Sequence, residues 1–282
     1  MTSSMPGPVL ITTDLDRTLI FSPRATCQLG GALPADAVEF SGGQTAGELS
    51  HAARDALAAL PAHARLCLAT SRSTRRLARL RLPFAARYSI AANGGVVLDG
   101  GAPDPRWAAR TAALLGKASP AAEVRAVFAS CAAAGPPGAT WLQRMGDEDD
   151  MCCLAIVEAS RFGAEQLAVV AGRCAELGWQ ASLIGRKLYA FPDGFGKRHA
   201  AEFVAGQVAR EAGAAPLRLA AGDTEHDRQM LADADLAWVP AGSELAARWP
   251  DLPDRRVTVT RQPGHAAAAQ ITRAWLETCL RR

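Results

Sequence analysis

Two aspartates, Asp14 and Asp16, stand two positions apart after an apolar run that begins at Val9. Two carboxylates held this close repel each other, and the repulsion raises a pKa unless a cation lies between them. The pair therefore indicates a site for a hard divalent metal ion or for a shared proton. Short acidic pairs also cap helices and bind water in loops, so the pair alone leaves a catalytic and a structural role open.

Two more segments carry groups that suit a phosphate. The sequence Thr70-Ser71-Arg72 follows a predicted strand and offers a hydroxyl and backbone amides at the start of a helix, where phosphate oxygens bind well. Lys197 follows Gly196 at the start of another predicted helix, and its cation could neutralise a phosphoryl group or a nucleophile. Each segment has an ordinary alternative, a helix cap for the first and a solvated lysine for the second.

A second acidic pair, Asp223 and Asp227, follows a further apolar strand at a spacing of four. Alone, this pair is equally typical of a helix N-terminus, where carboxylates complement the helix dipole. The order of the four segments is more specific: an acidic pair, a hydroxyl, a lysine and a second acidic pair, three of them at predicted strand ends. The ordered set, rather than any single motif, carries the prediction of an active site.

The elements that position these residues alternate between strand and helix. Apolar runs predict strands at residues 9–15, 66–69, 88–92 and 217–221, and helical spacing predicts helices at residues 46–60, 73–80 and 197–212. Such alternation predicts an α/β fold with a doubly wound, Rossmann-like parallel sheet. Residues 21–45 are rich in Gly, Pro and Ala without a clear period, and we expect a long loop or flap there.

The pattern changes between residues 100 and 189. Two amphipathic helices and four strand-like runs in this stretch predict a self-contained α+β insertion. We therefore expect a catalytic core formed by residues 1–99 and 190–282, interrupted by an inserted cap domain at residues 100–189. An acidic turn at residues 147–150 could reach the site from the insertion, or it could be an ordinary solvated turn.

Bulk composition narrows the class of partner. The net charge is only +3, from 31 basic and 28 acidic residues, so no strong field favours nucleic acid or an anionic membrane. No apolar stretch approaches the roughly 18 residues that a membrane helix needs, and no secretory leader is recognisable. Seven cysteines without Cys-x-x-Cys spacing are typical of reduced thiols. We expect a cytoplasmic monomer or homodimer that binds a small metabolite, not nucleic acid or membrane.

The ordered segments resemble the four motifs of the haloacid dehalogenase (HAD) superfamily of phosphotransferases, and the resemblance covers nearly the whole chain. The insertion between the second and third motifs is similar to the large α/β cap of Cof-type and sucrose-phosphate-phosphatase-like members. Asn93-Gly94-Gly95 resembles the Asn-Gly turn of those subgroups. Residues 14–22 and the Asn93 turn are also similar to uncharacterised members associated with tellurium-resistance gene sets.

The resemblance implies a covalent mechanism. Asp14 would attack phosphorus to form an aspartyl-phosphate, and Asp16 would protonate the leaving oxygen and then activate water. Lys197 would stabilise the charge that develops. Phosphate or substrate contacts are expected at Thr70, Ser71, Arg72, Asn93 and Gly94, with Thr70 as the phosphate-binding hydroxyl.

The resemblance also implies Mg²⁺ as the cofactor. Its protein ligands would be the Asp14 carboxylate, the backbone carbonyl of Asp16, and Asp223. Asp227 would be a further carboxylate at the metal, either directly or through water.

Two positions depart from the family pattern. Arg17 stands where Gly is usual, and His226 stands where Asn is common. Arg17 could add a cation beside the phosphate or simply cover the strand end. His226 could tune Asp227 through a hydrogen bond, or it could be a neutral histidine with a structural partner.

The expected function is Mg²⁺-dependent hydrolysis of a phosphomonoester on a sugar, polyol or nucleotide-like metabolite, with the cap excluding bulk water from the site. Two alternatives stay open. A sugar phosphomutase of the same superfamily would carry the same acidic pair and would yield an isomerised sugar phosphate instead of inorganic phosphate. A non-catalytic metabolite-binding subunit would have no need of the second aspartate, Asp16.

Overall fold

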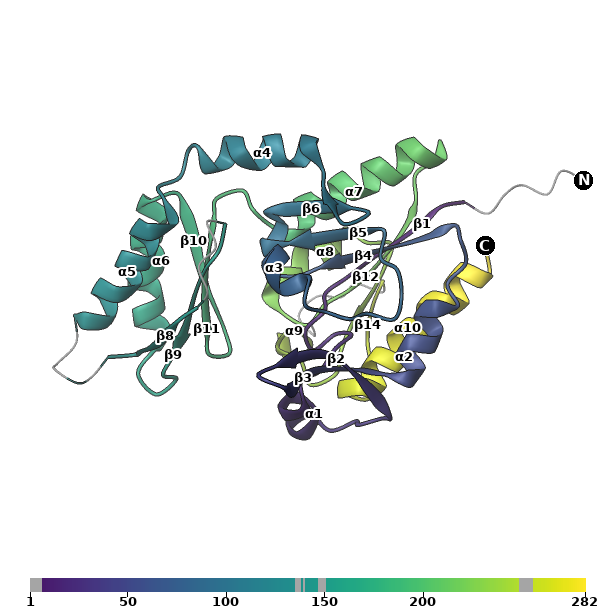
Figure 1. The fold of residues 1–282 in the computed structure, drawn as a ribbon, viewed down its shortest axis with the longest axis horizontal. Coiled ribbons are helices and arrows are strands. Elements are labelled where there is room, and N and C mark those ends of the chain that lie inside the picture. Colours follow the sequence, from purple (N-terminus) through teal and green to yellow (C-terminus); the bar gives the residue numbers. More distant parts are fainter. Residues whose placement is uncertain (1–6, 135–137, 139, 147–150, 249–255) are drawn as a thin grey trace, which may run out of the picture. The chain divides into compact units, whose positions relative to one another are not determined.

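The computed structural model of the chain describes residues 7–134, 138, 140–146, 151–248 and 256–282 (Figure 1). The chain divides into two compact units. One consists of Met1–Asp104 together with Gly196–Arg282, and the other of Pro105–Phe195. We call them the core unit and the inserted unit.

The core unit is built on an eight-stranded sheet in the order β14-β13-β12-β1-β4-β5-β6-β7. Six neighbouring strands pair in parallel: β14 (Val257–Val259), β13 (Leu236–Val239), β12 (Leu217–Ala221), β1 (Val9–Thr13), β4 (Ala64–Ala69) and β5 (Tyr88–Ala91). The antiparallel pairs at one edge are made by β6 (Val96–Asp99) and β7 (Ala102–Pro103). The order reverses direction at β1, as in a doubly wound sheet.

The register of the central strands brings their carboxyl ends to one level. Thr13, the last residue of β1, is paired with Leu68 of β4 and with Ala221 of β12. All five residues of β1 are buried, which is typical of a central parallel strand covered on both faces. The segments that follow β1, β4 and β12 therefore emerge side by side at one edge of the sheet.

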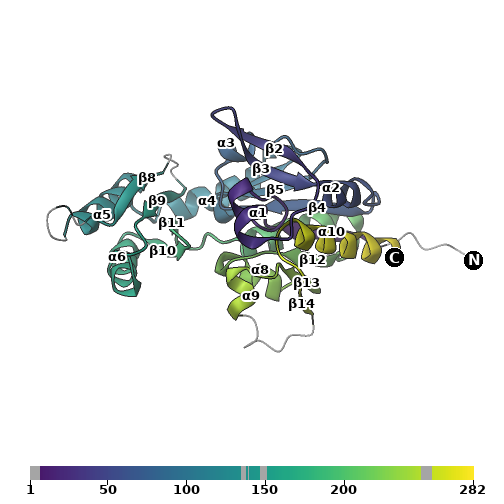
Figure 2. The same ribbon diagram turned by 90° about the horizontal axis from the view of Figure 1, so that it is seen from below.

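Helices cover both faces of this sheet. On one face, α2 (His51–Ala58) and α10 (Gly264–Leu280) lie side by side over β1, β4 and β12 (Figures 1 and 2). On the other face lie α7 (Lys197–Ala212) and α8 (Arg228–Ala232), which contact each other and the central strands. Shorter helices complete the unit: α1 (Pro23–Leu29), α3 (Thr74–Leu77), α9 (Glu244–Arg248), and the 3₁₀ turns η1 (Ala92–Gly94) and η2 (Glu225–Asp227).

The segment after β1 differs from the prediction. Instead of a loop over residues 21–45 followed by a helix from residue 46, the chain forms α1 and then a two-stranded hairpin of β2 (Ala35–Ser41) and β3 (Gln44–Ser50). The tight turn is made by Gly42 and Gly43, both at positive φ. Because residues 44–50 are paired in the hairpin, α2 begins only at His51.

The inserted unit has its own core. Its antiparallel sheet runs in the order β10-β11-β9-β8. The strands are β8 (Leu142–Met145), β9 (Cys153–Val157), β10 (Trp179–Ile184) and β11 (Lys187–Pro192), and the helices are α4 (Pro105–Leu115), α5 (Ala121–Ala133) and α6 (Ala164–Glu176). Trp179 is buried in the cluster between this sheet and the helices, and its indole Nε1 donates to the Ser119 carbonyl at 2.9 Å.

The limits of the two units lie five or six residues beyond the boundaries expected from the sequence. The first limit falls after Asp104 because β7 still pairs with β6, and because the Asp104 carboxylate accepts a hydrogen bond from Gln207 Nε2 on α7 at 2.6 Å. Neither the weak two-residue strand β7 nor this contact has a sequence signal of its own. Within the described ranges, no helix is both long and apolar enough to cross a bilayer.

The packing of α10 generates a stability prediction. Trp275 is fully buried in the cluster beneath the sheet and meets Trp238 edge-on at a ring distance of 6.4 Å. We expect Trp275→Ala to lower the free energy of unfolding by about 3–5 kcal/mol, because it removes a large buried side chain. Leu280→Ala on the same helix is the control, since that side chain is 67% exposed and should change stability by less than about 0.5 kcal/mol. Equal effects in chemical denaturation would contradict this packing.

Candidate active site

The first acidic pair leaves the end of β1 on a tight loop. The Asp14 amide donates to the Ala221 carbonyl at 2.9 Å, so this residue continues the sheet for one more step. The amides of Leu19 and Ile20 then both donate to the Leu15 carbonyl, which closes the loop. Asp14 is buried, whereas the side chain of Asp16 is 44% exposed. One carboxylate of the pair is thus enclosed and the other is open to solvent.

Arg17 has a backbone conformation that favours glycine. Its φ is +64°, in the left-handed region that costs a residue with a Cβ about 1–2 kcal/mol. The amide of Arg17 donates to the Ile20 carbonyl at 2.8 Å, so the loop requires this conformation. The Arg17 side chain is exposed.

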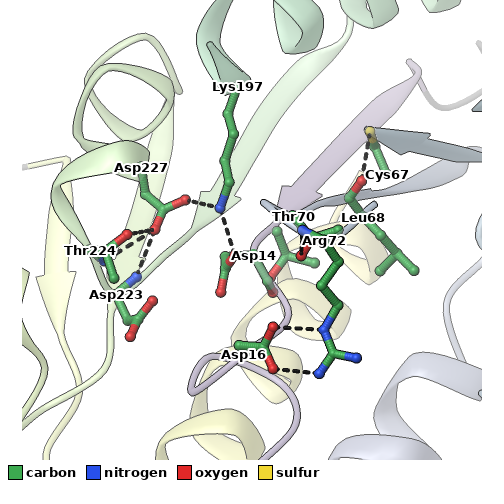
Figure 3. Close-up of polar contacts among 11 residues, drawn as sticks. Asp14, Asp16, Cys67, Leu68, Thr70, Arg72, Lys197, Asp223, Thr224 and Asp227 are labelled. Carbon is green, nitrogen blue, oxygen red and sulfur yellow. Dashed lines mark hydrogen bonds and ion pairs between the residues drawn. The ribbon is translucent and has the colours of Figure 1, made fainter. Parts of the chain in front are cut away.

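Lys197 is the centre of the site (Figure 3). Its Nζ lies 2.6 Å from Asp14 Oδ1 and 2.7 Å from Asp227 Oδ1, and all three side chains are buried. Burial opposes the charge on this amine, but the two carboxylates outweigh burial and raise the pKa of Lys197. The first residue of α7 therefore places a permanent cation between the segments that follow β1 and β12.

In addition to Lys197, Asp227 binds the loop that follows β12. Its second oxygen, Oδ2, accepts hydrogen bonds from the Asp223 amide at 3.2 Å, the Thr224 amide at 3.1 Å and the Thr224 hydroxyl at 3.0 Å (Figure 3). Gly222 makes room for it: a Cβ on Gly222 would lie 2.4 Å from Asp227 Cβ. Both oxygens of Asp227 thus have protein partners, and its direct ligation of a metal remains a prediction.

Asp14 and Asp223 fit a divalent cation better. Asp14 Oδ2 is buried and has no hydrogen-bond partner among the described residues. Oxygens of Asp14, Asp223 and Asp227 lie within 4.8 Å of one another. Burial, opposed by Lys197, raises the pKa of Asp14 to about 7, and burial with the neighbouring carboxylates raises the pKa of Asp223. Buried carboxylates such as these ionise readily only when a cation lies nearby. They suit Mg²⁺, which prefers hard oxygen donors.

Thr70 and Ser71 lie in the loop after β4. The Thr70 hydroxyl is buried and accepts a hydrogen bond from the Arg72 amide at 3.1 Å, which leaves its own hydrogen able to donate. Ser71 is half-buried. The helix predicted over residues 73–80 is the short α3 (Thr74–Leu77), with Ser73 as its N-cap. The predicted phosphate contact of Thr70 therefore depends on its hydroxyl rather than on a helix N-terminus.

The Arg72 guanidinium binds two carboxylates. Its Nε and Nη2 donate to the two oxygens of Asp16 at 2.8 and 2.6 Å, and its Nη1 donates to Glu39 Oε1 at 2.8 Å. Burial opposes ionisation of the guanidinium, but these two partners raise the pKa of Arg72. Glu39 is a site residue that the sequence did not reveal, because it lies in the segment predicted as a structureless flap.

The Asn93-Gly94 turn packs against the segments that carry Thr70 and Lys197. Ala92, Asn93 and Gly94 all have positive φ, and the Asn93 amide donates to the Thr70 carbonyl at 3.0 Å. A Cβ on Gly94 would lie 2.4 Å from the Gly196 carbonyl oxygen, so the turn packs directly against the residue before Lys197. The contacts of Asn93 and Gly94 position Thr70 and Lys197, and their predicted contact with substrate stays a prediction.

His226 adds no charge near neutral pH. Burial, together with the Lys197 charge, lowers its pKa to about 4. The acidic turn at residues 147–150 lies outside the described residues.

Comparisons with solved structures identify the fold. The sucrose-phosphatase of Synechocystis sp. PCC6803, solved in complex with sucrose and phosphate, aligns at 15% identity over 96% of this chain and 98% of its own, with a TM-score of 0.62. The HAD subclass IIB sugar phosphatase BT4131 aligns at 14% identity over 96% and 98%, with a TM-score of 0.58. BT1666 of Bacteroides thetaiotaomicron, from a study of HAD phosphatases, aligns at 15% identity over 99% of both chains, with a TM-score of 0.53. No family model matches the sequence, and no curated protein matches it.

The chain therefore has the haloacid dehalogenase fold, with a Rossmann-like core and an inserted α+β cap domain. The fold implied by the four ordered motifs is confirmed. At these identities the likeness establishes the fold, and the chemistry must be argued from the residues of this chain.

The close approach of Gly222 to Asp227 can be tested by substitution. Gly222→Ala should lower the free energy of unfolding by about 1–3 kcal/mol, because Asp227 must move away from Lys197 or from the Thr224 loop. The matched control is Gly206→Ala within α7, whose added Cβ would meet only Arg210 Nη1 at 3.5 Å and should be neutral or stabilising by about 0.5–1 kcal/mol. Chemical denaturation of both variants measures the difference; a stable Gly222→Ala protein would contradict the described contact.

The raised pKa values predict how a cation changes stability with pH. Asp14 titrates near 7 in the folded chain and near 3.8 in the unfolded chain, so the folded state binds more protons between these values and stability falls as pH rises through the window. Bound Mg²⁺ stabilises the ionised carboxylates and should reduce that fall. We expect Mg²⁺ to raise the melting temperature more at about pH 8 than at about pH 5, relative to EDTA.

In that experiment, Asp14→Asn should lose most of the Mg²⁺-dependent shift, because the variant has one ionisable ligand fewer. A shift of the same size at both pH values, or one that survives in Asp14→Asn, would contradict a cation site at these carboxylates.

Proposed function

We propose that the chain is a Mg²⁺-dependent phosphomonoester hydrolase in which Asp14 takes the phosphoryl group from a small phosphorylated metabolite. The observation that carries the proposal is the state of the Asp14 carboxylate. Lys197 holds one of its oxygens at 2.6 Å, and the other is buried without a partner among the described residues, close to Asp223. A carboxylate fixed in this way is desolvated and oriented, as a nucleophile must be.

In the first half-reaction an Asp14 oxygen forms a bond to phosphorus while the bond from phosphorus to the leaving oxygen breaks. Asp16 supplies the proton that the leaving oxygen needs. The Asp16 side chain is 44% exposed, so it can reach the leaving oxygen of a substrate whose phosphoryl group lies at the buried Asp14. Lys197 and the Thr70 hydroxyl offer donors for the negative charge that accumulates on the phosphoryl oxygens.

In the second half-reaction the ionised Asp16 takes a proton from water, and the water oxygen attacks phosphorus. The bond between Asp14 and phosphorus breaks, which releases inorganic phosphate and restores both aspartates. The hydrogen bond from Lys197 to Asp227 gives the amine a second carboxylate partner that takes no part in bond formation.

Asp14 and Asp223 are the residues that would hold Mg²⁺, together with the Asp16 carbonyl. When bound there, the cation offsets the charge of the carboxylates and of the phosphoryl oxygens. Asp227 would act beside them by fixing Lys197 and the loop that carries Asp223.

The fold neighbours and the inserted unit support a proposal for the substrate class. The similar solved proteins include a sucrose-phosphatase bound to sucrose and phosphate and a sugar phosphatase of subclass IIB. We propose a phosphorylated sugar or a related polyol or nucleotide-like metabolite, with the inserted unit acting as the cap that supplies substrate contacts. A sugar phosphomutase would use the same Asp14 and Asp16, so the product has to be identified.

The test is phosphate release from a panel of phosphorylated metabolites with Mg²⁺. The parent protein should release phosphate, and Asp14→Asn should be at least about 1,000-fold slower because it lacks the nucleophile. The variant should keep a cooperative unfolding transition, since Asn has nearly the same shape. Chelation by EDTA should abolish release by the parent.

The outcomes separate the candidates. Isomerised sugar phosphate without inorganic phosphate identifies a mutase. Undiminished phosphate release by Asp14→Asn rules out the covalent mechanism, and a folded parent that turns over none of the panel counts against the hydrolase proposal.

A further inference from the structure

Glu39 is an acidic side chain aimed into the core unit by an irregularity in β2. Along β2, Ala37 pairs with Glu48 and Glu39 pairs with the next residue back, Gly47, so Val38 is an extra residue in a β-bulge. A regular strand sends neighbouring side chains to opposite faces. Here both Val38 and Glu39 are buried, at 1% and 8% exposure, which the bulge makes possible.

The residue opposite Glu39 leaves space for its side chain. Gly47 has no side chain, and a Cβ built there would lie 3.3 Å from Glu39 Cβ and 3.4 Å from Glu39 Oε2. A buried carboxylate needs a partner to offset the loss of water, and Glu39 finds it in Arg72, whose Nη1 lies 2.8 Å from Glu39 Oε1. The bulge, Gly47 and Arg72 together fix the position of this carboxylate.

Arg72 connects Glu39 to the proposed acid–base residue. Its guanidinium is planar, and the two bonds to Asp16 fix the plane of that carboxylate as a bidentate pair. The third bond, to Glu39, prevents the guanidinium from rotating about its own axis. Without Glu39, the half-exposed Asp16, the group that Arg72 has to orient, would be the one remaining carboxylate that the described residues offer the guanidinium.

We propose that Glu39 is a positioning residue that holds the Arg72 guanidinium in the orientation in which it fixes the Asp16 carboxylate. The inference rests on the proposed function, because the importance of Asp16 as proton donor and acceptor comes from it. It also changes the predicted role of Arg72. All three nitrogens of the guanidinium already bind carboxylates, and turning it toward a phosphate would leave the buried Glu39 unpaired.

The leaving group of the substrate gives a readout specific to Asp16. An alkyl phosphomonoester releases a strongly basic alkoxide that needs a proton as the P–O bond breaks, whereas an aryl ester such as p-nitrophenyl phosphate releases a stable anion that does not. The ratio kcat/KM reports the steps up to loss of the leaving group. Misplacement of Asp16 should therefore lower kcat/KM for alkyl substrates selectively, while general damage to the site should lower both alike.

The variants are Glu39→Gln and Arg72→Lys. For each, we expect kcat/KM to fall about 10-fold or more on an alkyl phosphomonoester and less than about 3-fold on the aryl ester. Asp36→Asn is the matched control, since it removes one negative charge from the same strand at an exposed ion pair with His51 and Arg54 and should change neither value. Equal losses on both esters, or none, would overturn the positioning role.

A double-mutant cycle tests the same connection without activity. Glu39→Gln and Asp16→Asn each leave the buried Arg72 with one carboxylate, but the double variant leaves it with none. The unfolding midpoint of the double variant should therefore fall by more than the sum of the two single shifts. Additive shifts would overturn the inference even in a protein that hydrolyses phosphate esters, whereas an inactive parent with a non-additive cycle would count against the proposed function alone.

Discussion

The site depends on a buried cation that carboxylates from separate parts of the chain share. Lys197 Nζ is hydrogen-bonded to Asp14, which follows β1, and to Asp227, which follows β12, and all three side chains are buried. None of these groups would be stable there alone, because an unpaired buried charge costs several kcal/mol. The amine and the two acids make one another's burial possible, so the ends of β1 and β12 and the start of α7 are constrained together.

The buried carboxylates outnumber the one buried amine that they surround. Lys197 is one positive charge beside Asp14, Asp223 and Asp227, and the Asp223 and Asp14 carboxylates have raised pKa values as a result of burial and mutual repulsion. Asp16 stands apart from this group in being half-exposed and bound to its own cation, Arg72. The two members of the first acidic pair thus have different electrostatic surroundings although they are two residues apart.

The sequence predicted the parts of the site that depend on short motifs at strand ends. Asp14, Lys197, Asp223 and Asp227 come together as the strand and helix alternation implies, because parallel strands carry their carboxyl ends to one edge. Glu39 was not predictable, because a β-bulge in a segment rich in Gly and Ala gives no periodic signal. The packing of Gly94 on Gly196 was also hidden, since it joins two backbone positions a hundred residues apart.

The chain leaves the core unit after Asp104 and returns to it at Gly196, and both points are joined to helix α7. Asp104, just before the inserted unit, accepts a hydrogen bond from Gln207 of α7, and Gly196, just after it, is the N-cap of α7 and packs against Gly94. The helix that carries Lys197 therefore anchors the two ends of the insertion. Because both anchoring contacts lie within the core unit, changes confined to residues 105–195 would leave the positions of Asp14, Lys197 and Asp223 unaltered.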